Sequence, residues 1–227
     1  MDRTDITNLF IKKEANRKLH MPQVIGNFDD IINSNLGYLV LNKMIPHDII
    51  AKEIANVESL FVEHRSEYDE SKGWFGFCLH GKSYDATRED SYYKDNRNMS
   101  WTAEAEKMMP NTVNFFKNDW FGNSFARLRI MKLIPGGYIN CHRDCEKPSQ
   151  LGAINIAITN PEGNMFLMEN WGVVPFEKGR CIMLNLSNIH AVVNNSSKIR
   201  YHIIVHHLDV TDAFKRTVIN SANPIKS

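Results

Sequence analysis

The chain has 227 residues, which is enough for one domain with a substantial hydrophobic core. Its 27 basic and 26 acidic side chains leave a formal net charge of +1, which gives no indication of a nucleic-acid partner or an anionic membrane surface. No signal peptide is recognised, and no apolar run reaches the ~18 residues that a membrane helix needs. Four cysteines are too few for a disulfide scaffold, so a reduced, cytoplasmic protein is expected.

The first part of the chain is expected to combine an outer segment with one strand and one helix. Residues 1–35 are polar and mixed, which indicates an N-terminal arm or an outer helix. Residues 36–42 form a short apolar run typical of a strand. Pro46 is expected to open a helix that ends near His64, because apolar residues recur there at spacings of three and four.

Residues 36–124 as a whole are expected to support the fold and to line the substrate side of a site. Residues 74–80 are aromatic and strand-like. Residues 102–120 predict a second helical stretch, which Pro110 interrupts or restarts.

Residues 125–210 consist of repeated short runs rich in valine, isoleucine and leucine. Turn-forming segments separate these runs at residues 135–137, 160–164, 177–179 and 194–197. Repeated short strands with turn signals are typical of an all-β sandwich or barrel. We therefore expect a single domain over residues 1–227, with a β core in its second half and helices from the first half packed outside.

A histidine and a carboxylate lie two residues apart at His142 and Asp144. On an extended segment, residues i and i+2 point to the same side, so both side chains can reach one metal ion. His190 follows a predicted strand and is the best candidate for a third ligand. Two histidines and one carboxylate leave three open positions on an octahedral metal, as in non-haem Fe(II) oxygenases. Taken alone, His-x-Asp is also common enough to arise by chance in a chain with nine histidines.

Arg200 adds a second feature to this site, because it lies on an apolar strand ten residues after His190. A guanidinium that points into a barrel is costly unless it meets an anion, and its planar fork suits a carboxylate. A dicarboxylate cosubstrate can chelate the metal at one end and meet Arg200 at the other. Strand alternation equally permits Arg200 to face solvent, together with His202 and His206, which share its parity.

The segments of the second half also come in an order that resembles one enzyme family. The matching segments are residues 126–144, with a Pro-Gly turn and His-x-Asp, residues 179–197, with the distal histidine, and residues 199–205, with the arginine. Together, residues 126–207 resemble the catalytic core of the aspartyl/asparaginyl β-hydroxylase-like proteins, within the Fe(II)/2-oxoglutarate-dependent dioxygenases. Residues 73–81 and 98–116 resemble, more loosely, the tryptophan-bearing substrate side of that family.

The resemblance implies a mainly β fold with flanking helices (α+β), built on a double-stranded β-helix, that is, a cupin-like jelly roll. It implies that His142, Asp144 and His190 bind Fe(II) and that Arg200 binds the distal carboxylate of 2-oxoglutarate. Family members consume 2-oxoglutarate and dioxygen and release succinate and CO2 as they hydroxylate a substrate. A small-molecule or polypeptide substrate is expected here, as an amino acid, a peptide or a protein side chain of the Asp, Asn or Pro kind.

One strand departs from the family pattern. Family members usually carry Arg-x-His on the strand after His-x-Asp, whereas Ala153 and Asn155 stand at these positions here. An asparagine amide can still donate a hydrogen bond to a carboxylate, so Asn155 is expected to contact the cosubstrate.

The substrate side is predicted from basic and aromatic side chains. Arg127 and Arg129 share one strand face and can meet a substrate carboxylate, although an ordinary polar strand face explains them equally well. Trp74, His80 and Trp101 are candidates for the walls of the substrate pocket. Simple core packing is the competing interpretation, and we favour it for at least one of the tryptophans.

Two other functions remain open on the sequence alone: a cupin-like metal-binding module without redox activity, and a zinc or manganese enzyme of another class. The combination of metal ligands with a carboxylate-binding arginine argues against the binding module, because a simple binder does not need the two together. Zinc or manganese cupins usually carry three histidines and a glutamate instead of His-x-Asp with a distal histidine and an arginine. Cys141 and Cys145 flank the His-x-Asp pair, but no second cysteine pair with zinc-finger spacing lies nearby, so they are interpreted as packing residues or incidental thiols.

Overall fold

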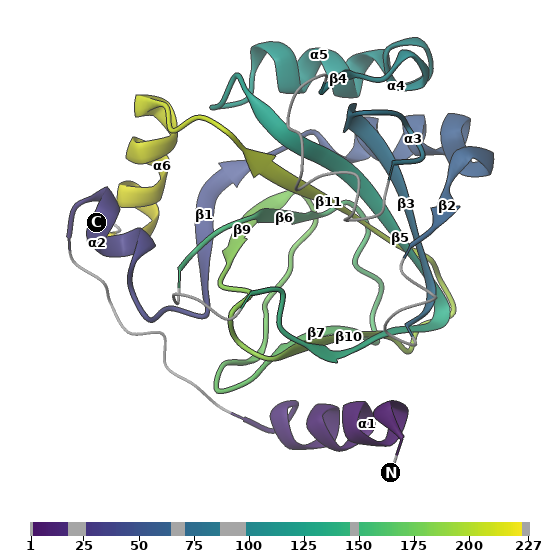
Figure 1. Ribbon diagram of the computed structural model, residues 1–227, viewed down its shortest axis with the longest axis vertical. Coiled ribbons are helices and arrows are strands. Elements are labelled where there is room, and N and C mark those ends of the chain that lie inside the picture. The colour runs from purple at the N-terminus through teal and green to yellow at the C-terminus, as the bar shows by residue number, and fades with distance from the viewer. Residues whose placement is uncertain (1, 18–25, 65–70, 87–98, 146–149, 224–227) are drawn as a thin grey trace.

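The computed structural model describes residues 2–17, 26–64, 71–86, 99–145 and 150–223 (Figure 1). In these ranges the helices are α1 (Arg3–Glu14), α2 (Phe28–Ile32), α3 (His47–Val57), α4 (Ala103–Met108), α5 (Pro110–Asn118) and α6 (Asp212–Ala222), with a 3-10 turn, η1, at Glu58–Leu60. The strands are β1 (Tyr38–Met44), β2 (Val62–Glu63), β3 (Lys72–Gly81), β4 (Ser100–Trp101), β5 (Phe125–His142), β6 (Ile154–Ala157), β7 (Asn164–Met168), β8 (Gly172–Val173), β9 (Arg180–Leu184), β10 (His190–Asn194) and β11 (Arg200–His207).

These strands form one antiparallel sheet that curls around an interior, as Figure 1 shows. The strand order is β1-β9-β6-β11-β5-β10-β7-β8, and β3 joins at β5 and carries β2 and β4. The first part of β5 pairs with β11 and β3, and its last part pairs with β10. The arrangement is a jelly roll with flanking helices, so the fold predicted from the sequence is confirmed.

The turn predicted at residues 135–137 is wrong, because β5 runs through it as one strand of 18 residues. Gly136 has a φ of 72°, in the left-handed region that L side chains rarely adopt, so the strand bends there instead of ending. A Cβ added to Gly137 would lie 2.9 Å from the carbonyl oxygens of Ile134 and Lys72, so this position also favours glycine. The bend carries β5 from one half of the barrel to the other.

Alternate residues of β5 belong to two hydrophobic clusters. Leu128 and Ile130 are fully buried in the cluster beneath the helices, whereas Met131 belongs to the cluster in the barrel interior. Because side chains alternate along a strand, Arg127 and Arg129 share the interior face with Met131. The strand therefore brings two cations into the barrel.

The helix predicted after Pro46 is confirmed, but it is shorter than expected. The apolar stripe of α3 is buried, with Ile50, Ile54 and Val57 at most 2% exposed. The prediction that this helix reaches His64 is wrong, because η1 follows α3 and the chain then pairs with β3 as strand β2. Tertiary pairing with β3 therefore ends the helical region before His64.

The predicted break at Pro110 is confirmed, since α4 ends before it and α5 begins with it. The first backbone N–H groups of α5 are capped by a side chain of α3: the Glu53 carboxylate accepts hydrogen bonds from the backbone N–H groups of Asn111 and Thr112, at 2.9 Å each. Burial raises the pKa of Glu53, but hydrogen bonds from these two residues outweigh burial and hold the pKa below its usual value.

The sequence predicted an N-terminal arm or an outer helix, and the structure has an outer helix, α1, near the N-terminus. Helix α1 lies against β5, β7 and β10 (Figure 1). The Thr7 hydroxyl of this helix donates a hydrogen bond to the side-chain oxygen of Asn140 at 2.8 Å. Residue 1 and residues 18–25 of the predicted arm lie outside the described residues.

Helix α6 was not predicted. The Thr211 hydroxyl caps it by accepting a hydrogen bond from the Phe214 N–H, and the helix packs against β1 and α2. A threonine N-cap with apolar residues at Phe214 and Val218 was the available signal. Among the helices that the structure describes, none has the length and apolar character to cross a membrane.

Candidate metal and cosubstrate site

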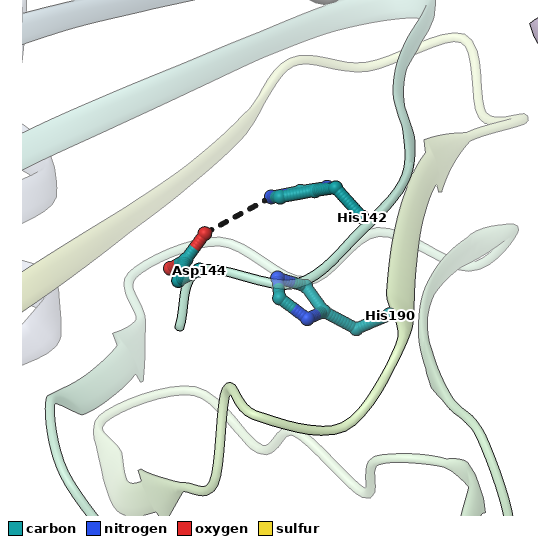
Figure 2. A group of neighbouring side chains, drawn as sticks. All are labelled: His142, Asp144 and His190. Atoms are coloured by element: carbon teal, nitrogen blue, oxygen red, sulfur yellow. Dashed lines mark ion pairs between the residues drawn. The ribbon is translucent and has the colours of Figure 1, made fainter. Parts of the chain in front are cut away.

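The structure brings His142, Asp144 and His190 together at one end of the barrel (Figure 2). His142 ends β5 and His190 begins β10, and the two residues are paired directly across these antiparallel strands. Their ring centroids are 4.3 Å apart, and the His142 Nε2 lies 3.2 Å from the Asp144 Oδ1. One ligand atom from each residue lies within 4.8 Å of the other two, which is compatible with a shared metal ion.

Both imidazoles are held in the same tautomer by backbone carbonyl groups. The His142 Nδ1 lies 2.6 Å from the carbonyl oxygen of Asn140, and the His190 Nδ1 lies 3.0 Å from that of Asn188. A carbonyl oxygen can only accept, so each Nδ1 carries the proton and donates it. In the neutral ring, the proton on Nδ1 leaves the lone pair on Nε2, which is the form of histidine that binds metals.

The surroundings favour neutral imidazole and a positioned carboxylate. Burial, followed by the neighbouring His142, lowers the pKa of His190 to about 4. The Phe166 ring stacks on His190 with 5.4 Å between centroids and an interplanar angle of 6°. The Asp144 backbone N–H donates to the carbonyl oxygen of Leu186 at 3.0 Å, which anchors the segment after β5. Two imidazole nitrogens and one carboxylate form a donor set suited to a non-haem iron centre with open positions.

A cavity opens beside these three residues into the barrel interior. Besides the triad, its lining includes Arg127, Arg129, Asn155, His202 and His206. Four of these five side chains are basic in type, and they come from the adjacent strands β5 and β11. Burial lowers the pKa of His202 and His206, so Arg127 and Arg129 are the cations that make this cavity electropositive beside the triad.

Arg200 is buried in the barrel but is not among the residues that line the cavity. It is 2% exposed, and its Nη1 donates to the His202 Nδ1 at 2.9 Å. Its guanidinium lies over the Phe176 ring at 5.4 Å, and its Nη2 has no hydrogen-bond partner among the described residues. Burial lowers the pKa of Arg200 to about 10, so the side chain remains a cation at neutral pH. The expectation that Arg200 faces into the barrel agrees with this burial.

Asn155 is buried on β6 and lines the same cavity. It stands opposite Ile204 of β11, and its Nδ2 has no hydrogen-bond partner within the described part of the chain. A buried amide donor without a protein partner is costly unless a ligand or water satisfies it. The residue therefore suits the contact expected from the sequence.

A family model with the description "Aspartyl/Asparaginyl beta-hydroxylase" matches residues 45–209. This range contains the metal-ligand triad, Arg200 and the cavity-lining strands. The chain belongs to the aspartyl/asparaginyl β-hydroxylase family. It is a hydroxylase, as predicted from the sequence. Among curated protein sequences, none matches the chain.

Several solved structures resemble this hydroxylase in fold. A 2OG-Fe(II) oxygenase-family oxidoreductase from Burkholderia pseudomallei is 12% identical, with a TM-score of 0.48 and with 88% of this chain and 99% of that chain covered. A viral collagen prolyl hydroxylase from Paramecium bursaria Chlorella virus-1 is 14% identical, with a TM-score of 0.44 and coverage of 75% and 95%. A prolyl-4-hydroxylase from Pseudomonas putida is 10% identical, with a TM-score of 0.46 and coverage of 80% and 97%.

The residues predicted for the substrate side of this hydroxylase fall into two groups. Arg127, Arg129 and Trp74 line the cavity beside the triad. His80 and Trp101 do not line it: their rings pack edge to face at 5.4 Å between centroids, against Phe125 of the cluster beneath the helices. The pairing of β3 with β5 shifts register between Cys78 and His80, which changes the face that His80 presents.

Three histidines in the cavity lining were not predicted as site residues: His64, His202 and His206. The signal for two of them was their parity with Arg200 on β11. Strand alternation assigns such residues to one face but does not say that this face is the interior. His207, of opposite parity, instead stacks on Trp120 and Phe121 in an aromatic group outside the cavity.

Proposed function

We propose that this hydroxylase binds Fe(II) through His142, Asp144 and His190, and uses 2-oxoglutarate and dioxygen to hydroxylate an amino acid, a peptide or a protein side chain. The observation that carries the proposal is the triad, with one carboxylate beside two imidazoles that both present an unprotonated Nε2. Bound iron with its cosubstrate would supply the oxidising chemistry, and the protein would supply ligands, orientation and a dry interior.

The cosubstrate is proposed to lie between the triad and the deeper part of the barrel. Its keto-acid end belongs at the metal, and its distal carboxylate belongs near Arg200 and Asn155. Two orphaned donors support this direction: the Nη2 of Arg200 and the Nδ2 of Asn155 have no hydrogen-bond partner among the described residues. A carboxylate would satisfy both and would neutralise a buried guanidinium.

The substrate is proposed to carry a carboxylate or a related acceptor group, as Asp, Asn and proline do. Arg127 and Arg129 are both buried and line the cavity that contains the metal ligands, which supports this assignment. Trp74 from β3 adds an apolar wall to the same cavity. His80 and Trp101 have no such support, because they lie outside the lining residues.

The first experiment is anaerobic. Purified protein is loaded with Fe(II) and titrated with 2-oxoglutarate, and the visible charge-transfer band of an iron-chelated keto acid is recorded. The proposal expects a saturable band that disappears when His142 or His190 is replaced by alanine. Iron binding without a band would sink the oxygenase assignment and leave a metal-binding module or another class of metalloenzyme.

A further inference from the structure

His202 stands between Arg200 and the cavity. Both residues lie on the interior face of β11, because they are two apart on one strand. His202 is among the residues that line the cavity, and Arg200 is not. His202 therefore contacts both the cavity and, through its Nδ1, the guanidinium of Arg200.

The contact with Arg200 decides which nitrogen of His202 carries a proton. An arginine guanidinium has donors only, so the His202 Nδ1, 2.9 Å from Arg200 Nη1, must accept. A neutral imidazole whose Nδ1 accepts carries its one proton on Nε2. The imidazole thus has an N–H donor on the side that is turned away from Arg200.

The electrostatic setting keeps this imidazole neutral. Burial, followed by the nearby charges of Arg200 and Arg129, holds the pKa of His202 well below its usual value. Only the acceptor form of Nδ1 is compatible with the Arg200 hydrogen bond in any case. An N–H donor flanked by two cations is a favourable place for an anion.

The adjacent strand β6 places a small side chain and a donor without a partner beside His202. His202 stands opposite Ala157 of β6, whose side chain is a single methyl group. Asn155 precedes Ala157 by two residues and lies on the same face of β6. The Nδ2 of Asn155 has no partner in the described part of the chain. Position 155 carries an asparagine, whereas the resembling family usually has a histidine there, and His202 supplies an imidazole from the neighbouring strand β11.

From this geometry we infer that His202 is a second contact for the distal carboxylate of 2-oxoglutarate, to which it donates a hydrogen bond from Nε2. Arg200 then has two roles: it attracts the same carboxylate and it fixes the donor tautomer of His202. The inference rests on the proposed function, and it adds a residue that the sequence did not single out.

The test compares two keto acids that differ only at the distal end. 2-Oxoglutarate and 2-oxopentanoate have the same chain length, but a methyl group replaces the distal carboxylate in 2-oxopentanoate. Their dissociation constants are measured from the charge-transfer band of the anaerobic Fe(II) protein, for the wild type, His202→Asn and His202→Gln. The amide group of asparagine lies about as far from the backbone as the imidazole Nδ1. The amide group of glutamine lies about as far from the backbone as Nε2, so it can replace the proposed donor.

Loss of a hydrogen bond to a charged group predicts that His202→Asn weakens 2-oxoglutarate by about 10-fold or more. The affinity for 2-oxopentanoate should stay within about twofold, and His202→Gln should recover most of the affinity for 2-oxoglutarate. Tyr201→Phe is the control, because Tyr201 is next on the strand and its hydroxyl donates to Glu58 on the outer side. That variant should change neither affinity.

Unchanged affinity of His202→Asn for 2-oxoglutarate would overturn the inference. The charge-transfer band in the same experiment would still support the proposed function. Equal weakening of both keto acids would also overturn the inference, since His202 would then act on the metal end or on the fold. Should His202→Asn fail to fold, His202→Met gives the same comparison with a side chain of similar size and no donor. Absence of any band in the wild type would overturn the proposed function and this inference together.

Discussion

The two imidazoles of the proposed metal site are oriented by main-chain atoms. The carbonyl oxygens of Asn140 and Asn188 each accept the Nδ1 proton of the histidine two residues later. Both Nε2 atoms are therefore ready to bind a metal without rearrangement of the rings, and Asp144 completes one face. Removal of either imidazole leaves two protein ligands.

At this scale we predict that His142→Ala and His190→Ala each lower Fe(II) affinity by more than about 100-fold, because a lost ligand costs more than a lost supporting hydrogen bond. Anaerobic equilibrium dialysis with iron quantification measures the change. His47→Ala, a histidine on the first turn of α3, is the matched control and should bind iron as the wild type does. Retention of iron by either ligand variant would refute the assignment of that ligand.

Arg200→Lys should leave Fe(II) affinity unchanged and weaken 2-oxoglutarate by about 10-fold or more. Lysine keeps the charge, but it loses the planar fork and one of the donors that a buried carboxylate needs. The charge-transfer titration of the iron-loaded protein gives the affinity for 2-oxoglutarate, and anaerobic equilibrium dialysis gives the affinity for Fe(II). A parallel loss of iron affinity would show that Arg200 supports the metal site instead of the cosubstrate.

The sequence predicted which residues share a strand face where the alternation of side chains along the strand was the only information needed. Arg127 and Arg129 share a face because strands alternate, whereas Asp144 lies near His142 although it follows the end of β5 by two residues. His202 was harder to assign, because alternation fixes the face that it shares with Arg200 and does not say which face is buried. His80 shows the opposite difficulty, since a register shift between Cys78 and His80 breaks the alternation.

At the scale of elements, β5 contributes more residues to the cavity lining than any other strand. Arg127 and Arg129 lie in its first part and His142 at its end, with the bend at Gly136 between them. The sequence predicted a turn there, because proline and glycine usually end a strand. The strand continues because glycine accommodates the left-handed conformation while pairing resumes on the far side with β10.

Gly136→Ala should lower the free energy of unfolding by about 1–2 kcal/mol, since an L residue pays that cost in the left-handed region. A Cβ at this position meets no heavy atom within 4 Å, so backbone conformation alone should account for the change. Gly136→Asn should recover part of the loss, because asparagine tolerates this region. Urea unfolding measures both variants.

The control for this prediction is Gly152→Ala. Gly152 has no left-handed φ, and an added Cβ would lie 3.8 Å from its nearest neighbour, the carbonyl oxygen of Leu184. The free energy of unfolding should therefore change by no more than about 0.5 kcal/mol. An equal loss of unfolding free energy in both variants would contradict the prediction that the left-handed conformation at Gly136 favours glycine.

At the scale of the whole molecule, the chain buries several histidines as neutral rings. Burial is the largest cause of the lowered pKa of His80, His202, His206 and His207, and for His206 the charges of Arg127 and Arg129 lower it further, to about 3. In the unfolded chain these imidazoles return to a pKa of about 6.5. These histidines therefore take up protons at a lower pH in the native state than in the unfolded state.

The metal-free protein should lose stability as the pH falls below about 6.5, because the unfolded state then binds protons that the native state excludes. Above that pH both states are neutral at these histidines, and they contribute no pH dependence. Each histidine contributes at most about 1.4 kcal/mol per pH unit. Urea unfolding at pH 7.5, 6.5 and 5.5 measures the slope, and His206→Asn should reduce it. A flat profile would contradict the assignment of these rings as neutral.

The carbonyl groups that orient His142 and His190 also bear on how such a site persists through evolution. An amide carbonyl is present whatever side chain a residue carries, so the tautomers do not depend on the identity of positions 140 and 188. Mutation at these two positions can alter packing, such as the contact between Asn140 and Thr7 of α1, without changing which nitrogen faces the metal. Inheritance of the proposed iron site would then require three side chains and one path of the backbone.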